Sequence, residues 1–234
     1  MPIHIQPSRF ELVIHSKRPL TSNLASRPPS CRCMAVSWDM RKLFTLFCLL
    51  APLSAETIDA FGLRWDVPFS KDWAFEDGVL RMLVARPSEK PRRPMQFALA
   101  QTGPFSKLTM EAEVKRGKNS LILVYAWRGP DHFNYVHLST DTAQKANHHN
   151  GVFHVYGGDR VRISSTEGPA ALGPVEWTRV KLVYDAKTGE AVAWVNGITS
   201  PSLRGIDLSL TAGRVGIGSF FETAQFRNVK ISGE

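Results

Sequence analysis

Cysteine is scarce in this chain, and its three copies, Cys31, Cys33 and Cys48, all lie within the first 55 residues. The other 179 residues therefore offer no disulfide, no thiol nucleophile and no cysteine-ligated zinc. The sequence also contains no H-E-x-x-H, no G-x-S-x-G and no phosphate-binding glycine loop. These absences argue against zinc peptidases, serine hydrolases with a nucleophile elbow and P-loop enzymes.

A strong charge of one sign is missing too, once the chain is divided at Ala55. The formal net charge is +8, but residues 56–234 hold 22 basic and 19 acidic residues, a net charge of +3. No basic stripe is evident along the sequence. We therefore predict no nucleic-acid partner.

A membrane-spanning run is absent, but a shorter apolar run follows Met40. Two positive charges at Arg41 and Lys42, the apolar run Leu43–Leu53 and small residues up to Ala55 follow in the order of a secretory signal peptide. The run is shorter than the about 20 residues that a membrane span needs. We predict a signal peptide at 40–55, a misassigned start covering 1–39, and an extracytoplasmic (periplasmic or secreted) protein without a membrane partner after cleavage. A genuine long leader or an internal apolar segment is the alternative.

Long amphipathic helices are lacking, whereas short apolar or alternating runs separated by turn residues fill Phe61–Ile231. Asp77-Gly78 and Asn196-Gly197 are strong hairpin signals. Residues 56–234 are therefore predicted to form one all-β domain, a two-sheet antiparallel β-sandwich of the jelly-roll type. The mixed run L-I-L-V-Y-A-W indicates a strand covered on both faces. The Pro-rich, charged stretch Pro87–Pro94 is predicted to be a solvated hairpin tip, or else a basic rim for an acidic partner.

Five of the seven histidines lie in one window, His132–Tyr156, which has the pattern of a strand, a polar loop and a strand. Side chains two residues apart in a strand share a face. If Val136 and Leu138, and likewise Phe153 and Val155, face the core, then four other side chains emerge together on the opposite face. These are Tyr135, His137, His154 and Tyr156.

Aromatic rings beside imidazoles and amides suit a sugar, because the rings cover its C–H faces and the polar groups meet its hydroxyls. We therefore predict a saccharide-binding face. Its candidate residues are Tyr135, His137, His154 and Tyr156, with Asn134 beside them and Trp127, Arg128 and Arg160 at the rim. Solvated or packing roles for any single one of them are the alternative.

No metal and no cofactor are predicted from these histidines. His132 and His137 are an odd number of residues apart, which places them on opposite faces of a regular strand. A His137/His154 pair with a loop ligand such as Asp141 is an alternative that the spacing allows, and His148 and His149 are adjacent in the loop and could turn either way. Calcium stays open, since the oxygen-rich stretches Ser139–Asp141 and Asn147–Asn150 offer carbonyl and carboxylate ligands.

Paired catalytic carboxylates have one candidate, Glu111 and Glu113 in T-M-E-A-E-V-K. Retaining glycosidases need two carboxylates about 5–5.5 Å apart. The third acidic residue of the E-x-D-x-x-E signature is absent, so we predict outward-facing surface carboxylates instead.

Several runs resemble a known family: D-H-F-N-Y-V-H-L-S, H-N-G-V-F-H-V-Y-G-G-D-R-V-R-I-S, W-T-R-V-K-L-V-Y-D-A-K-T-G-E-A-V-A-W-V-N-G and G-R-V-G-I-G-S-F-F-E-T-A-Q-F-R-N-V-K-I-S-G. Over Trp73–Gly233 the chain resembles bacterial secreted domains of the concanavalin A-like lectin/glucanase superfamily. It is most similar to the 3-keto-disaccharide hydrolase domain family, whose members are labelled family-sixteen-like glycoside hydrolases. The resemblance implies a jelly roll whose concave face takes carbohydrate, and it implies no catalytic residue at a numbered position.

Two hypotheses follow. The first is a carbohydrate-active domain that binds, and in an enzymatic version hydrolyses, a saccharide or glycoside. The second is a non-catalytic carbohydrate-binding, protein-interaction or structural β-sandwich, which the missing carboxylate pair favours.

Overall fold

The structure, a computed structural model, describes residues 55–117, 120–139, 149–165, 176–196 and 203–234. All of them belong to the second of the chain's two units, Ala51–Glu234. The predicted extension (1–39) and signal peptide (40–55) lie outside the described residues, apart from Ala55. No helix among the described residues has the length and apolarity needed to cross a membrane.

The described residues form strands and one short 3₁₀ helix, Ser70–Asp72. In chain order the strands are β1 (Glu56–Ala60), β2 (Leu63–Val67), β3 (Trp73–Glu76), β4 (Val79–Met82), β5 (Phe97–Ala100), β6 (Lys107–Arg116), β7 (Ser120–Gly129), β8 (His132–Ser139), β9 (Gly151–Tyr156), β10 (Arg160–Arg162), β11 (Thr178–Asp185), β12 (Glu190–Val195), β13 (Leu203–Ile206), β14 (Arg214–Gly218) and β15 (Ala224–Gly233). The predicted all-β class is confirmed.

Of two tight hairpin turns in the structure, one was predicted from the sequence and the other was not. Asp77 and Gly78 have φ angles of 53° and 72° and join β3 to β4, as the Asp-Gly pair predicted. Phe61 and Gly62 have φ angles of 56° and 73° and join β1 to β2. The hairpin signals named from the sequence do not include this turn, because phenylalanine is not a residue that signals a left-handed turn position.

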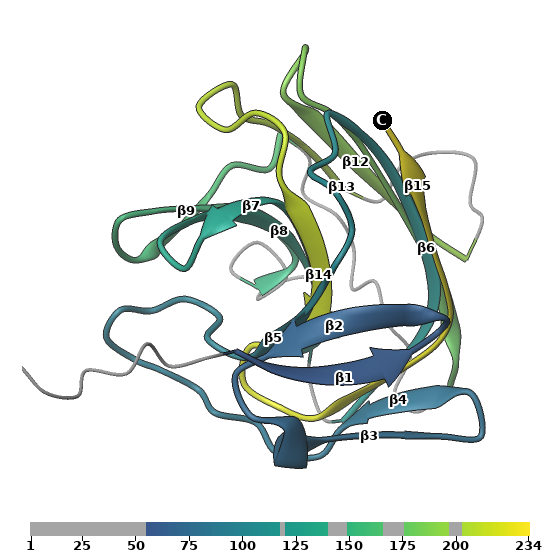
Figure 1. The fold of residues 1–234 in the computed structure, drawn as a ribbon. Helices are drawn as coiled ribbons and strands as arrows, with labels where there is room; N and C mark the ends of the chain where they lie inside the picture. Colours follow the sequence, from purple (N-terminus) through teal and green to yellow (C-terminus); the bar gives the residue numbers. More distant parts are fainter. Residues whose placement is uncertain (1–54, 118–119, 140–148, 166–175, 197–202) are drawn as a thin grey trace, which may run out of the picture. The chain divides into compact units, whose positions relative to one another are not determined.

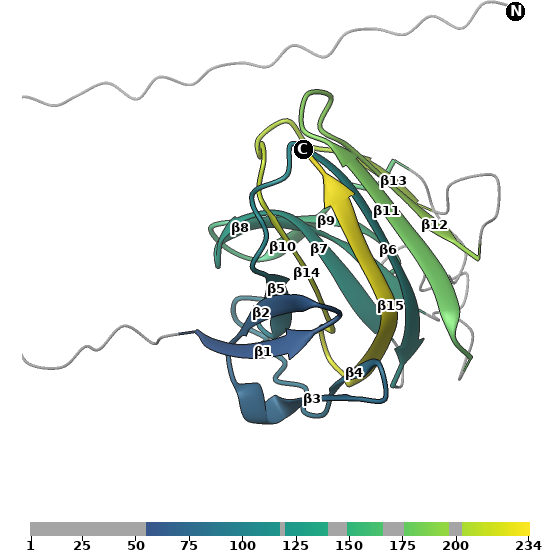
Figure 2. The ribbon, with the colours of Figure 1, turned by 45° about the vertical axis from the view of Figure 1, so that its right-hand side comes forward.

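The strands make two antiparallel sheets that face each other (Figures 1 and 2). The eight-stranded sheet has the order β1-β2-β5-β14-β7-β8-β9-β10, and the seven-stranded sheet has the order β13-β12-β11-β6-β15-β4-β3. Neighbours such as β14 and β7 or β15 and β6 are distant in sequence, so the connections cross between the sheets. The predicted two-sheet sandwich is confirmed.

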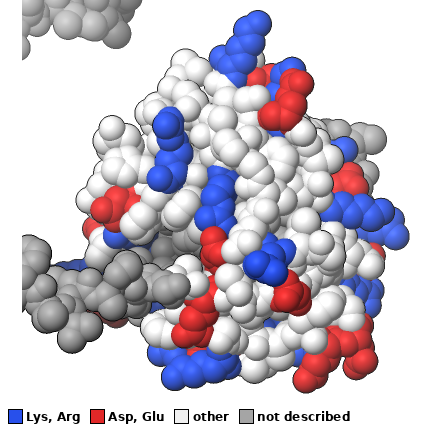
Figure 3. Space-filling model, viewed as in Figure 1, with Lys and Arg blue, Asp and Glu red and all other residues white. Residues whose placement is uncertain are grey.

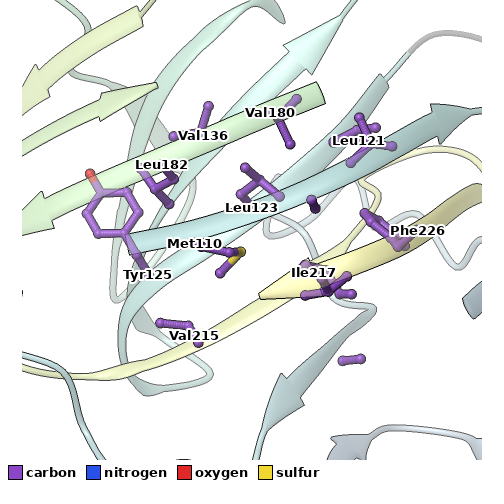
Figure 4. Packing of buried hydrophobic residues seen from close by; sticks show 14 of the residues in the cluster. Met110, Leu121, Leu123, Tyr125, Val136, Val180, Leu182, Val215, Ile217 and Phe226 are labelled. Carbon is purple, nitrogen blue, oxygen red and sulfur yellow. The ribbon is translucent and has the colours of Figure 1, made fainter. Parts of the chain in front are cut away.

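The main core lies between the sheets (Figure 4). Strand β6 alternates between buried and more exposed residues, so Met110 and its alternate neighbours face this core, where Leu123, Leu182 and Phe226 also pack. Alternation is the pattern of a strand with one solvated face. The seven-stranded sheet therefore has an outer face that is open to polar side chains.

The eight-stranded sheet is covered on both faces. On β7, Leu121, Leu123 and Tyr125 face the main core, whereas Ile122 and Val124 belong to a second apolar group on the other face. This agrees with the prediction for L-I-L-V-Y-A-W. We call the second group the aromatic cluster; it comprises Phe97, Leu99, Ile122, Val124, Phe133, Tyr135, Phe153, Val155 and Phe220.

Charges of both signs are mixed on one face of the molecule. On the face shown in Figure 3, Lys and Arg side chains are interspersed with Asp and Glu side chains. This distribution fits the small net charge predicted for residues 56–234.

Candidate functional site

Strand pairing separates the four side chains that were predicted to share one face. Strands β8 and β9 are antiparallel, with Tyr135 opposite Phe153, Asn134 opposite His154, and His132 opposite Tyr156. Directly opposed residues lie on the same face of a sheet. Tyr135 and His137 therefore lie on one face, and His154 and Tyr156 lie on the other.

The prediction of one common face is wrong, and the error lies in β9. Phe153 and Val155 were expected in the same core as Val136, but they belong to the aromatic cluster, and Val152 packs in the main core instead. Both faces of β9 carry apolar residues, so hydrophobicity alone could not determine which face is which.

Tyr135 and His137 are interior residues, only 0% and 1% exposed. Arg160 of β10 reaches over the aromatic cluster, with its guanidinium carbon 4.5 Å from the ring centre of Phe153 and 4.6 Å from that of Phe220. Its Nη1 lies 3.3 Å from the Tyr135 hydroxyl and 3.3 Å from His137 Nδ1. Arg160 is therefore a structural part of this cluster, and the expected exposure of Tyr135 and His137 is corrected.

Burial changes the ionisation of both groups. It raises the pKa of Tyr135 to about 12, so the hydroxyl stays protonated. Burial, helped by the positive charge of Arg160, lowers the pKa of His137 well below its usual value. His137 is therefore a neutral imidazole at neutral pH, which matches its place beside a guanidinium.

The loop between β4 and β5 is tied to the ends of β8, β9 and β10. The backbone N–H of Arg92 donates to Asp159 Oδ1 at 2.7 Å, and the N–H of Arg160 donates to the Arg92 carbonyl at 3.0 Å. Arg93, which is buried, pairs with Asp131. The prediction of a solvated tip at Pro87–Pro94 is therefore wrong at this end of the loop, where Arg92 and Arg93 bind carboxylates of the chain itself.

We expect the neutral, buried His137 to make folding pH-dependent. Because its folded pKa lies below the unfolded value of about 6.5, the unfolded chain takes up more protons below that pH. The contribution of neutral His137 to stability should be fully present above about pH 6.5. Below that pH, protonation of His137 in the unfolded chain should lower the free energy of unfolding by up to about 1.4 kcal/mol per pH unit. Urea denaturation between pH 5 and 8 measures the slope, and His137→Gln should have a shallower one. An equal slope in the variant would refute this assignment.

His154 and Asn134 meet Asp207, which follows β13. Asn134 Nδ2 donates to Asp207 Oδ2 at 2.7 Å, and His154 Nδ1 lies 2.9 Å from the same oxygen. The other oxygen accepts from the backbone N–H of Ser209 at 2.8 Å and from its hydroxyl at 2.6 Å. We call His132, Asn134, His154, Tyr156 and Asp207 the rim cluster.

The hydrogen bonds keep Asp207 ionised. Burial acts to raise the pKa of this carboxyl, but hydrogen bonds from Ser209 and Asn134 together hold the pKa below its usual value. A carboxylate at Nδ1 fixes the proton of neutral His154 on that nitrogen. Nε2 of His154 is then the nitrogen that can accept a proton or a hydrogen bond.

Tyr156 supplies an exposed aromatic plane beside this polar group. Its side chain is 61% exposed, and its ring stacks on the imidazole of His154 with 5.6 Å between centres and 13° between planes. The ring of His132 meets Tyr156 edge-on at 4.5 Å. The rim cluster therefore combines a flat ring, imidazoles, an amide and a carboxylate.

The remaining candidates divide between the two groups. Trp127 packs at the border of the aromatic cluster, with the Arg214 guanidinium 5.4 Å from its ring centre. Arg128 is exposed and donates from Nη1 to Thr211 Oγ1 at 2.7 Å, in the segment that continues from Asp207. Arg128 therefore contacts the segment that follows Asp207, whereas Trp127 and Arg160 lie against the aromatic cluster.

Asp207 was missed by the sequence-based prediction. It is 53 residues from His154 and comes from a segment attached to the other sheet. The pattern Asp-Leu-Ser at 207–209 is a local signal for a carboxylate held by its own turn. That signal does not reveal which imidazole the carboxylate meets.

Within the described ranges, no group of three His, Cys, Asp or Glu side chains is placed to hold a metal ion. Asp141, Asn147 and His148, which figured in the metal and calcium alternatives, lie outside those ranges. The absence of a metal and cofactor therefore stays a prediction.

Comparison with known families identifies the chain. The profile described as the 3-keto-alpha-glucoside-1,2-lyase-like domain matches residues 58–232. The chain belongs to this family. The predicted family is thus confirmed, and the match covers every described strand from β2 to β14.

Solved structures share the sandwich fold. A mutant of the GH43 protein BlXynB from Bacillus licheniformis is 11% identical with a TM-score of 0.54, over 77% of this chain and 38% of that one. A xylan beta-1,4-xylosidase from Bacillus halodurans C-125 is 12% identical with a TM-score of 0.51, over 76% of this chain and 38% of that one. The carbohydrate binding module CBM66 from Bacillus subtilis is 14% identical with a TM-score of 0.48, over 77% and 93%.

At these identities the two structures with TM-scores above 0.5 show the fold alone, and the chain spans well under half of those two proteins. No curated protein matches the chain.

Proposed function

We propose that this chain is a carbohydrate-active sandwich domain that binds saccharide at the rim cluster. The observation that carries the proposal is the exposed ring of Tyr156 stacked on an imidazole that Asp207 holds in place. A sugar placed on Tyr156 would cover apolar C–H groups with the ring and direct hydroxyls to His154 and His132. Family membership and the fold shared with glycan-handling proteins support this assignment.

Because the aromatic cluster is filled by the chain's own side chains, we assign no ligand to it. Tyr135 and His137 are buried, and Arg160 occupies the space beside them. Of the eight residues first considered, the proposal therefore keeps His154 and Tyr156 as ligand contacts. Asn134 is kept as a buried support of Asp207, and Arg128 as a neighbour that contacts the segment after Asp207.

A glycan array probed with the purified protein tests the proposal. We expect one or more saccharides to bind, and Tyr156→Ala to weaken binding at least tenfold, because loss of the stacking ring removes about 1.4 kcal/mol or more of contact energy. The matched control is Phe75→Ala, which removes another exposed ring, 41% exposed, from β3 of the other sheet. Equal binding by wild type and Tyr156→Ala would contradict the proposal.

Saccharide cleavage is a second candidate, and the His154–Asp207 pair favours it. An imidazole oriented by a carboxylate is a common general base. On a 3-keto-α-glucoside, Nε2 of His154 would take the proton from carbon 2, which the carbonyl at carbon 3 makes acidic. The C–H electron pair would form the double bond between carbons 1 and 2, and the glycosidic oxygen would leave with its bonding pair and take up a proton.

Incubation with a 3-keto-α-glucoside, with detection of the released alcohol and the unsaturated sugar, tests this candidate. We expect His154→Gln to abolish turnover but to retain the stacking ring and hence part of the binding. Turnover that survives His154→Gln would exclude His154 as the base.

Secretion through residues 40–55 belongs to the same proposal, and N-terminal sequencing of exported protein should show Glu56 first.

A further inference from the structure

The outer face of the seven-stranded sheet has a groove of about 750 Å³ that lies away from the rim cluster. Strands β6, β11, β12 and β15 form it. The lining residues that matter here are Glu111, Glu113, Arg179, Lys181, Trp194 and Lys230.

Strand register arranges these side chains in two rows across the sheet. Trp194, Lys181, Glu111 and Lys230 are consecutive cross-strand neighbours from β12 to β15. Arg179, Glu113 and Arg227 form the adjoining row. Between the rows β15 has an irregularity, where the register shifts and Asn228 has a φ of 53°. The extra residue on β15 bends this strand locally.

The cations of this face outnumber the carboxylates that neutralise them. Arg227 binds Glu113 through Nε and Nη2, each 2.6 Å from Oε2, and holds the pKa of that carboxyl below its usual value. Lys181 lies 3.5 Å from Glu111. Arg179 and Lys230 are exposed and form no ion pair with another described residue. The charge of Arg179 also lowers the pKa of Glu113, so Arg179, Lys181, Arg227 and Lys230 with the two carboxylates leave a net charge of +2 on this face.

Aromatic surface accompanies the charge. The ring of Trp194 lines the groove, and that of Trp177 lies under Arg227 at 4.2 Å. Tryptophan faces stack on sugar rings, and cations pair with carboxylates or sulfates. The two glutamates can accept hydrogen bonds from hydroxyl groups. Such a surface suits a chain of sugar rings in which acidic groups are spaced apart by neutral hydroxyls.

We propose that this groove is a separate binding site for an anionic polysaccharide, such as a polyuronate. A polyuronate carries one charge per sugar together with free hydroxyls, which matches Arg179, Lys230 and the two carboxylates. A nucleic acid carries a phosphate on every nucleotide and gains its affinity from phosphate contacts, so the carboxylates on the groove floor oppose it. The proposal goes beyond saccharide binding at the rim cluster and does not depend on it.

Affinity electrophoresis of the full chain in gels with polygalacturonate, neutral dextran or single-stranded DNA tests the proposal. We expect retardation by polygalacturonate, weakened at least tenfold in the double variant Arg179→Gln/Lys230→Gln and reduced by salt. Trp194→Ala should weaken it as well. Lys71→Gln, an exposed lysine outside the groove, and Tyr156→Ala should leave it unchanged. Melting temperatures confirm that each variant is folded.

Three outcomes overturn the groove: no retardation by polygalacturonate, retardation that the double variant retains, or DNA retardation of equal strength that the double variant abolishes. If Tyr156→Ala abolishes polygalacturonate binding and the double variant does not, the rim cluster binds the acidic glycan. The groove proposal then fails while the proposed function stands. If the array detects no rim-dependent binding but the groove variants lose polyuronate binding, the proposed function fails and the groove proposal stands.

Discussion

Replacement of Tyr135 by alanine is expected to destabilise the domain by about 3–5 kcal/mol, the range for truncating a large buried ring. Tyr135 is 0% exposed and stacks on Phe153 with 5.3 Å between ring centres and 13° between planes. Alanine would leave a cavity inside the aromatic cluster and would remove a partner of Arg160. Urea denaturation of wild type and variant measures the difference.

One control distinguishes the loss of the buried ring from the loss of its hydroxyl group. A second distinguishes the loss of a buried tyrosine from the loss of an exposed one. Tyr135→Phe keeps the ring and should cost about 1 kcal/mol, the typical net contribution of one hydrogen bond. Tyr156→Ala removes an exposed ring and should change stability by no more than about 0.5 kcal/mol. If Tyr135→Ala were neutral and Tyr156→Ala strongly destabilising, the two faces of β8 and β9 would be exchanged.

Replacement of Asp207 by alanine should affect both stability and the site. Asn134 is fully buried and donates to this carboxylate, so its amide would lose a partner at a cost of about 1–3 kcal/mol. The imidazole of His154 would also lose the group that fixes its proton on Nδ1. We expect Asp207→Ala to have a lower urea midpoint than the wild type. It should also weaken saccharide binding, as His154→Ala should.

A matched pair of variants isolates the charge of Asp207. Asp207→Asn keeps an acceptor for Asn134 but removes the negative charge, so stability should recover more than binding does. Asp59→Ala removes an exposed carboxylate of the β1–β2 hairpin and should leave the urea midpoint unchanged. Unaltered stability and binding in Asp207→Ala would show that the rim cluster is not organised by this carboxylate.

The sequence predicted the fold well because the relevant signals are local. Asp77-Gly78 identifies one hairpin, and the alternation in β6 identifies the face of the seven-stranded sheet that packs in the core. The β1–β2 hairpin was missed because its turn is formed by Phe61 and Gly62. The conformation of this turn depends on pairing between β1 and β2, and the identities of the two turn residues do not predict it.

The candidate site was predicted less well, because its geometry depends on contacts between distant segments. Strand parity gives the correct face for Val136 and Leu138 on β8, but it cannot orient β9, whose two faces are both apolar. Asp207 joins His154 only through the packing of β13 near β9. The positively charged groove likewise gathers residues from separate strands, so a net charge of +3 for residues 56–234 gave no sign of it.

The burial of Tyr135 and His137 has a consequence for function. In this chain the face of the eight-stranded sheet that carries them is filled by the aromatic cluster and Arg160. The saccharide site that we propose therefore excludes this face and lies at the rim cluster, where Tyr156 and His154 are accessible.

The most direct test of saccharide binding at the rim cluster is chemical-shift mapping by NMR. The protein would be titrated with a neutral saccharide that binds on the array. We predict the largest shifts at the side chains of Tyr156, His154 and His132, and at the backbone of residues 207–209. Shifts confined to the outer face of the seven-stranded sheet, with none at Tyr156 or His154, would contradict the assignment of the rim cluster as the saccharide site.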